Sequence, residues 1–149
     1  MIIKIADTNE EREQLDQVLW EVLWAPLALS RDIRQTFALD NDPVEFIAVE
    51  NGDIVGGLVA NRIDENALEI RHIALAPNHQ QRSIGSGMVN ALVEFARKEG
   101  IDKIQAYARN TSLGFFMHNG FATGDKMTHP DFARHEITFQ KVVLNLEAP

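Results

Sequence analysis

Apolar and polar residues alternate along several stretches of the chain, and this period of two is the pattern of half-buried β-strands. One pair of such stretches is joined by Asn51, Gly52 and Asp53, and the Asn-Gly pair supplies the positive φ angles that a tight hairpin turn needs. We expect strands over residues 2–6, 44–50, 54–63, 67–76, 101–108, 121–127 and 135–146.

Other stretches repeat their apolar residues every three or four positions, which predicts helices. Thr8 and Glu11 form the Thr-x-x-Glu pattern of a capping box, so we expect a helix that starts there and ends at Pro26. Further helices are expected over residues 30–37, 84–100 and 111–119.

The resulting order of elements is β-α-α-β-β-β-α-β-α-β-β, without internal repeats or a linker between domains. This order predicts a mixed α/β sheet within a single domain over residues 1–149. The helix 84–100 joins the strands 67–76 and 101–108, and such a unit places its two strands parallel and adjacent, with a right-handed crossover.

The composition of the chain restricts its class. With 149 residues, of which 45% are hydrophobic, the chain is long enough to bury one core. It contains no cysteine, which excludes disulfide bonds and a cysteine nucleophile. It also contains no run of about 18 apolar residues, and its first residues do not form a signal peptide. We therefore expect a soluble, cytoplasmic protein that does not enter a membrane.

The charge balance bears on the partners of the protein. Lysine and arginine number 14 against 22 acidic residues, which gives a net charge of -8. Because such a chain repels a polyanion, we do not expect a nucleic-acid partner. The same acidity is compatible with a cationic substrate such as an amine.

Small residues gather in the segment 77–87, which connects the strand 67–76 to the helix after it. Such residues let a ligand approach the backbone closely, and the first amides of a helix have no partner within the helix. A helix start of this kind attracts phosphate, and Arg82 adds a positive charge. The segment lacks the lysine of a P-loop and the three-glycine spacing of a dinucleotide-binding motif, and a plain turn is its alternative explanation.

At this segment the sequence resembles the GNAT superfamily of acyl-CoA N-acyltransferases, and the resemblance extends over residues 44–146. The family signature Arg/Gln-x-x-Gly-x-Gly/Ala is matched from Gln80 to Gly85, with Ser83 in place of the first glycine. Residues 70–77 resemble the cofactor strand of the family. Residues 108–121 resemble its segment that contains an aromatic pair and ends in Gly-Phe.

The resemblance implies a mostly antiparallel central sheet with a parallel, splayed central strand pair and flanking helices. It further implies that acetyl-CoA binds as a co-substrate, with its pantetheine arm in the splay and its pyrophosphate at the helix start. The residues that would contact it are Ile73, Ala74, Leu75, Gln80, Gln81, Arg82, Ser83, Ile84, Gly85, Ser86, Gly87, Asn110, Phe115 and Phe116. The acceptor would be a small-molecule or peptide amine, and a homodimer would be compatible with the family.

The family commonly carries a tyrosine that protonates the departing thiolate, and Phe116 occupies that position here. A phenyl ring cannot donate a proton. Tyr107 is the only tyrosine of the chain and therefore the only phenol available as a substitute acid, with simple sheet packing as its alternative role.

Glu69 occupies a strand position at which some relatives carry a general base, and its alternative role is that of a structural carboxylate. The reaction needs a base because an amine with a pKa of about 10.4 is mostly protonated near neutral pH. From the period of two we expect Glu69 on the same face of its strand as Arg71, Ile73 and Leu75. We expect His72 on the opposite face, where it either enters the substrate cleft or is structural.

The favoured function is N-acetyl transfer from acetyl-CoA to an amine by direct attack, without a covalent enzyme intermediate. The alternative is a catalytically silent acyl-CoA-binding sensor or interaction module, which the residues at positions 83 and 116 suggest. We expect no metal, because the spacing of four candidate ligands fits no standard metal site. These candidates are His129, Asp131, His135 and Glu136.

Overall fold

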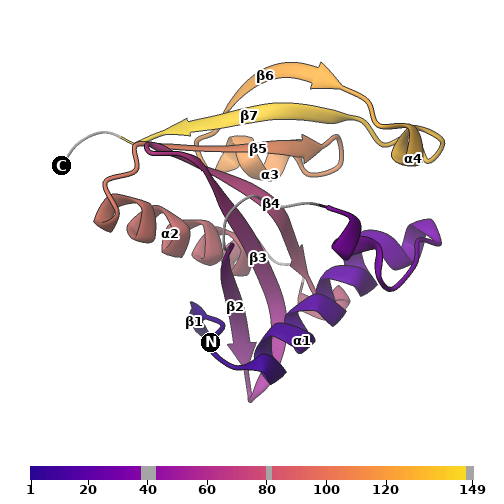
Figure 1. The fold of residues 1–149 in the computed structure, drawn as a ribbon, viewed down its shortest axis with the longest axis horizontal. Helices are drawn as coiled ribbons and strands as arrows, with labels where there is room; N and C mark the ends of the chain where they lie inside the picture. The colour runs from indigo at the N-terminus through magenta and orange to yellow at the C-terminus, as the bar shows by residue number, and fades with distance from the viewer. Residues whose placement is uncertain (38–42, 80–81, 147–149) are drawn as a thin grey trace.

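The computed structural model describes residues 1–37, 43–79 and 82–146. One seven-stranded sheet runs through it in the order β1-β2-β3-β4-β5-β7-β6 (Figure 1). Its strands are β1 (Ile2–Ile5), β2 (Val44–Glu50), β3 (Asp53–Asp64), β4 (Ala67–Leu75), β5 (Lys103–Arg109), β6 (Ala122–Met127) and β7 (Phe139–Asn145). All neighbouring strands are antiparallel except β4 and β5, so the predicted mixed sheet with one parallel pair is confirmed.

The helical elements flank this sheet. They are α1 (Asn9–Leu19), the π-helical turn η1 (Trp20–Trp24), the 3-10 turns η2 (Ala25–Leu27), η3 (Ile33–Thr36) and η4 (Pro77–His79), and the helices α2 (Arg82–Lys98), α3 (Leu113–His118) and α4 (Pro130–Ala133). The predicted start of α1 is confirmed, because the Thr8 hydroxyl accepts a hydrogen bond from the backbone N–H of Glu11 at 3.0 Å. The helix widens into η1 before Pro26, which lacks the N–H needed to continue it.

The C-terminal part of the chain differs from the prediction in two places. Residues 130–133 form a helical turn, and β7 begins at Phe139 rather than at residue 135. The backbone N–H groups of Phe132 and Ala133 both donate to the carbonyl of His129, at 3.0 and 2.8 Å, which closes this turn. Glu136 then adopts a positive φ of 60°, a conformation that is incompatible with a strand.

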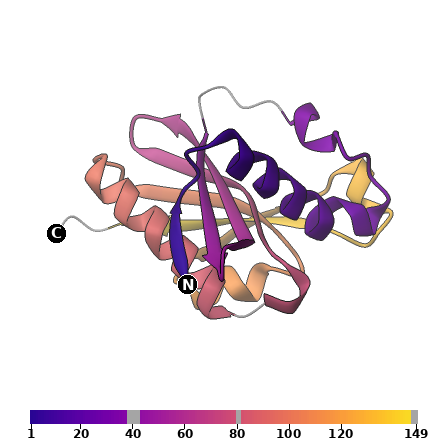
Figure 2. The ribbon, with the colours of Figure 1, turned by 90° about the horizontal axis from the view of Figure 1, so that it is seen from below.

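The two long helices cover opposite faces of the sheet, and Figures 1 and 2 show α1 and α2 on either side of β2 and β3. The core is therefore divided in two. Leu58, Met88 and Leu92 belong to the part beneath α2, and Leu15, Leu19 and Val59 belong to the part beneath α1. Gly57 allows α1 to approach the sheet closely, because a Cβ atom there would lie 1.9 Å from Leu15 Cδ1.

The parallel strands β4 and β5 separate before they end. Their register runs from the pair Ala67–Lys103 to the pair Ile70–Ala106 and goes no further. β4 nevertheless continues to Leu75, and β5 continues to Arg109. The predicted splay of the central pair is thus present, and the second half of β4 has a strand partner only on its β3 side within the described residues.

A β-bulge interrupts β4 just where the splay begins. Ile70 lies opposite Ala60 and His72 lies opposite Val59, so Arg71 is an extra residue with no counterpart on β3. A bulge of this kind shifts the alternation of side chains by one position. The faces of β4 on the two sides of Arg71 therefore cannot be counted with a simple period of two.

The predicted faces of β4 are wrong beyond this bulge. Glu69 lies opposite Asn61, and His72 lies opposite Val59. Residues that oppose each other in an antiparallel pair share a face, as do residues two apart on one strand. Glu69 and His72 consequently point to the same face, the α1 side, whereas Ile73 packs against the core on the α2 side.

Candidate active site

A cavity of about 420 Å³ lies where β4 and β5 part. Side chains of β4 and β5 line it together with residues of η1, α3 and α4. Glu69, Tyr107, Ile73 and Phe116, four of the residues named from the sequence, contribute to this lining. The splay therefore brings a carboxylate, a phenol and an apolar wall to one place.

Glu69 is buried, with 7% of its surface exposed, and both of its carboxylate oxygens accept a hydrogen bond. Gln105, its neighbour across the parallel pair, donates from Nε2 to Oε1 at 3.0 Å. Arg71 donates from Nη1 to Oε2 at 3.2 Å. Each carboxylate oxygen keeps a further lone pair, so Glu69 can still accept a proton or a hydrogen bond from a ligand in the cavity.

His72 lines the same cavity and is 9% exposed. Its Nε2 atom is buried without a hydrogen-bond partner among the described residues. Burial, together with the nearby charges of Arg34, Arg71 and Arg109, lowers the pKa of His72 to about 3. The imidazole is therefore neutral near pH 7, and it is a poor general base but an available hydrogen-bonding group.

Arg109 brings a positive charge to the far end of the cavity. Its Nη2 atom donates to the carbonyl of Leu23 at 2.9 Å, and its guanidinium lies 5.3 Å from the ring centroid of Phe132. Burial lowers the pKa of Arg109, although arginine stays charged at any ordinary pH. Within the described residues no carboxylate pairs with Arg109.

Four aromatic side chains, Trp24, Phe37, Phe132 and Phe139, form what we call the aromatic wall of the cavity. The rings of Trp24 and Phe37 lie 5.0 and 5.7 Å from the ring of His72. Phe132 packs edge-on against Phe139 at 5.4 Å. These rings make much of the cavity surface apolar.

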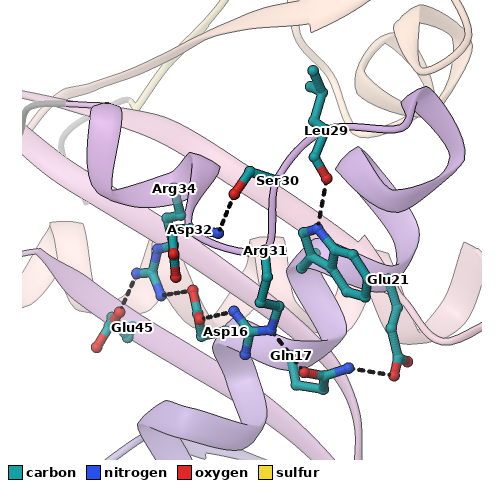
Figure 3. A network of polar contacts seen from close by, with 10 residues as sticks. Asp16, Gln17, Glu21, Leu29, Ser30, Arg31, Asp32, Arg34 and Glu45 are labelled. Carbon is teal, nitrogen blue, oxygen red and sulfur yellow. Dashed lines mark hydrogen bonds and ion pairs between the residues drawn. The ribbon is translucent and has the colours of Figure 1, made fainter.

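A polar network holds part of this wall in place (Figure 3). Asp16 on α1 accepts hydrogen bonds from Arg31 and Arg34, the latter at 3.4 Å between Nη1 and Oδ1. Arg34 also pairs with Glu45 on β2. Because these contacts join residues 25–37 to both α1 and β2, they position Phe37, the aromatic residue of this segment.

Tyr107 and Phe116 differ in their surroundings. Tyr107 belongs to β5, lines the cavity and is 40% exposed. It is therefore accessible both to solvent and to a ligand in the cavity. Phe116 is 2% exposed and packs edge-on against Phe115 and Phe121, at 5.3 and 5.2 Å between ring centroids. Phe116 is thus a core residue with one side on the cavity.

The start of α2 is the predicted phosphate site. Gln80 and Gln81 lie outside the described residues, and α2 begins at Arg82. Ser83 is exposed and Ser86 is half-buried. Because the first amides of a helix have no partner within the helix, a phosphate at this start stays a prediction.

The two glycines of α2 also have a packing role that the sequence did not reveal. A Cβ atom on Gly85 would lie 2.7 Å from Cε1 of Phe115, and one on Gly87 would lie 2.6 Å from Cδ1 of Ile3. Ile84 is buried beside them in the core beneath α2. The small residues therefore admit neighbouring side chains of the protein as well as leaving the backbone accessible.

The remaining predicted contact residues are distributed as follows. Ala74 packs on the α1 side, and Leu75 packs on the α2 side. The Asn110 side chain accepts a hydrogen bond from Thr138 N–H at 3.2 Å and donates to the carbonyl of Glu136 at 3.3 Å. Asn110 thus joins the end of β5 to the segment before β7, and its role toward a cofactor stays a prediction.

Metal-binding clusters and membrane-spanning helices are both absent from the part of the chain that the structure describes. No three histidine, cysteine or acidic side chains there lie close enough together to hold a metal ion. None of the helices in these residues combines the length and the apolar character needed to cross a bilayer.

Sequence reasoning did not select Arg109 or Phe132, and it gave His72 the wrong face. Arg109 follows Tyr107 by two positions on β5, so a period of two could have placed it on the same face. The face of His72 depends on the bulge at Arg71, which no pattern in the sequence announces.

Comparisons with known proteins bear on the family and the fold of this chain. The model of the acetyltransferase (GNAT) family matches residues 7–121. GCN5 of Tetrahymena is 16% identical with a TM-score of 0.77, and the match covers 100% of this chain and 98% of that one.

Two further solved structures are similar in the same way. An aminoglycoside 6'-N-acetyltransferase from Enterococcus faecium is 15% identical, with a TM-score of 0.78 and coverage of 100% and 99%. A GNAT family acetyltransferase from Elizabethkingia anophelis with acetyl-CoA bound is 17% identical, with a TM-score of 0.72 and coverage of 97% of both chains. Fold and family model together show that this chain belongs to the GNAT acetyltransferase family.

Proposed function

We propose that this protein transfers the acetyl group of acetyl-CoA to an amine, and that the reaction takes place in the cavity between β4 and β5. The observation that carries the proposal is the juxtaposition of an unpaired strand edge with a buried carboxylate. The edge begins after Ile70, and Glu69 lies directly beside its start.

The unpaired edge suits the pantetheine arm of the co-substrate. Within the described residues, β4 pairs with no strand on its β5 side from Arg71 to Ala74, so its backbone groups there can hydrogen-bond an extended chain that carries amide groups. The amides at the start of α2 suit the pyrophosphate, because they combine free N–H groups with the positive end of the helix dipole. Acetyl-CoA supplies the activated thioester.

The amine must lose a proton to attack, and in this proposal Glu69, which lines the cavity, takes that proton. The amine nitrogen forms a bond to the thioester carbonyl carbon, and its proton passes to Glu69 directly or through a water molecule. Gln105 and Arg71 hold the carboxylate in position from two sides. Their hydrogen bonds leave the lone pairs that face the cavity available.

The bulge at Arg71 can also help to stabilise the negative charge that develops during the attack of the amine. Arg71 lacks a counterpart on β3, so its backbone N–H can be directed at the carbonyl oxygen, on which negative charge develops. The C–S bond then breaks and CoA leaves as a thiolate. A thiol with a pKa of about 8.5 is a good leaving group near neutral pH, so a proton from Tyr107 or from solvent is sufficient.

The test is to incubate the protein with acetyl-CoA and a panel of amines, and to measure the release of free CoA thiol together with CoA binding by calorimetry. We expect CoA to bind and at least one amine to cause release well above the rate of hydrolysis without protein. Tight binding of CoA with no release for any amine would overturn the proposal in favour of a silent acyl-CoA-binding module.

A further inference from the structure

The cavity holds two polar groups whose interactions are incomplete. Arg109 carries a partly buried charge without a carboxylate partner among the described residues, and His72 has a buried Nε2 atom without any hydrogen-bond partner there. A buried charge or polar atom is costly unless a partner satisfies it. Glu69, by contrast, has a donor on each oxygen.

These two groups lie on the same side of the cavity. The ring of His72 packs against the ring of Trp24, with 5.0 Å between the ring centroids. Arg109 donates a hydrogen bond to the carbonyl of Leu23, which directly precedes Trp24 in the chain. The positive charges of Arg34 and Arg71 lie near His72 as well. Arg34 pairs with Asp16 and Glu45, and Arg71 pairs with Glu69. Among the arginines that the structure describes near His72, Arg109 is therefore the one without a carboxylate partner.

We propose that the acceptor amine also carries a carboxylate, and that Arg109, with His72 beside it, binds this carboxylate next to the aromatic wall. The inference rests on the proposed acetyl transfer and names the class of acceptor. It runs against the net charge of -8, which by itself would favour a purely cationic substrate. The charge of Arg109 inside the cavity should determine which acceptor binds, because the carboxylates on the distant surface are screened by salt.

The strand geometry indicates how far apart the two groups of the acceptor lie. Glu69 is level with Gln105, and Arg109 follows Gln105 by four residues on β5. Four residues of strand span about 13 Å, of which the two side chains cover a part. The amine at Glu69 and the carboxylate at Arg109 must therefore be separated by several bonds, as in a short peptide or an aromatic amino acid with its groups at opposite ends.

The experiment compares matched amines that differ only in the carboxylate. The first pair is 4-(aminomethyl)benzoate and 4-methylbenzylamine, and the second is a glycyl-phenylalanine dipeptide and its C-terminal amide. CoA release is measured with the wild-type protein, Arg109→Gln, Arg109→Lys and the control Arg97→Gln, which removes an equal charge from the exposed end of α2. Binding of each compound to the CoA-bound protein is measured in parallel by calorimetry.

We expect at least one acid to exceed its neutral counterpart about tenfold or more in kcat/KM. Arg109→Gln should bring that ratio to within about twofold, mainly by raising KM for the acid. Arg109→Lys should keep much of the preference, and Arg97→Gln should keep all of it.

Two results would overturn the inference. One is equal binding and turnover of the acid and the neutral amine in every pair by the wild-type protein. The other is a loss in Arg109→Gln that affects all substrates alike together with the melting temperature, which would make Arg109 a structural tie to the end of η1. CoA release without a preference for acids would refute the inference and leave acetyl transfer standing. Arg109-dependent binding of an acid without CoA release would support a carboxylate site at Arg109 and refute acetyl transfer.

Discussion

Glu69 and Gln105 lie directly opposite each other on the parallel pair β4–β5, and Gln105 Nε2 donates to Glu69 Oε1 at 3.0 Å. One pair further along, at Ile70 and Ala106, the pairing of the two strands ends. The carboxylate of Glu69 therefore lies at the point where β4 and β5 begin to separate, one residue before their pairing ends. A ligand that enters the gap meets Glu69 where the gap closes.

The proposed phosphate site at the start of α2 can be tested without disturbing the fold. Ser83 is exposed in the first turn, so Ser83→Glu places a negative charge where the pyrophosphate is expected. The variant should weaken CoA binding by more than about tenfold, or about 1.4 kcal/mol, in calorimetry. Gly85 is unsuitable for this test, because any side chain there would collide with Phe115.

The control is Ser83→Gln, which has the size of the glutamate variant without its charge. It should bind CoA within a few-fold of the wild-type protein. Unchanged CoA affinity in a folded Ser83→Glu variant would mean that the pyrophosphate binds elsewhere.

Phe116 should act as an apolar wall rather than as a participant in proton transfer. Phe116→Leu should lower the free energy of unfolding by about 1–2 kcal/mol, because it leaves space in the core, and should keep kcat within a few-fold. Steady-state kinetics and thermal denaturation separate the two effects.

Tyr107→Phe provides the matched comparison, since it removes the only phenol at the cavity and little else. Abolished turnover in Phe116→Leu with normal CoA binding and stability would contradict the passive role of Phe116. A loss of more than about tenfold in Tyr107→Phe would instead assign protonation of the thiolate to Tyr107.

His72 should make the stability of the protein depend on pH. Its pKa is about 3 in the folded protein against 6.5 in an unfolded chain, so the unfolded chain binds the proton more tightly. The contribution of His72 to stability is complete above pH 6.5 and is lost as the pH falls towards 3, by up to about 1.4 kcal/mol per pH unit. Replacement by phenylalanine should flatten this decline in denaturant titrations.

His118→Phe is the control for that measurement, because His118 is exposed on α3. It should leave the pH dependence of the wild-type protein intact. Parallel stability curves for the wild-type protein and His72→Phe between pH 4 and 7 would show that His72 is not the group responsible.

Much of the fold could be predicted from local sequence patterns. The Thr8 cap, the Asn51–Gly52 turn and the β4-α2-β5 unit depend on short-range chemistry, and all three are present in the structure. The strand β7 was predicted to start too early, because the turn at α4 depends on backbone contacts within residues 129–137 that no periodicity reveals.

The site could be predicted only in part, because its residues come from elements that are distant in the sequence. Glu69 and Tyr107 were selected from single strands, and the structure brings both to one cavity. The bulge at Arg71 reversed the expected face of His72, since one extra residue changes the alternation for the rest of the strand. Trp24 and Phe132 meet at the cavity only through tertiary packing.

The most direct test of the account is the pH dependence of kcat in Glu69→Gln. The glutamine can still accept a hydrogen bond from Gln105, but it removes the proton-accepting carboxylate and the ion pair with the half-buried Arg71. We expect kcat to fall by about 10²- to 10⁴-fold near neutral pH, CoA affinity to stay nearly unchanged, and kcat to recover partly at high pH, where free amine is abundant. The control Glu65→Gln, in the exposed turn before β4, should behave as the wild-type protein. A Glu69→Gln variant with a lower melting temperature but a kcat within a few-fold of the wild-type value would contradict the account and make Glu69 a structural carboxylate.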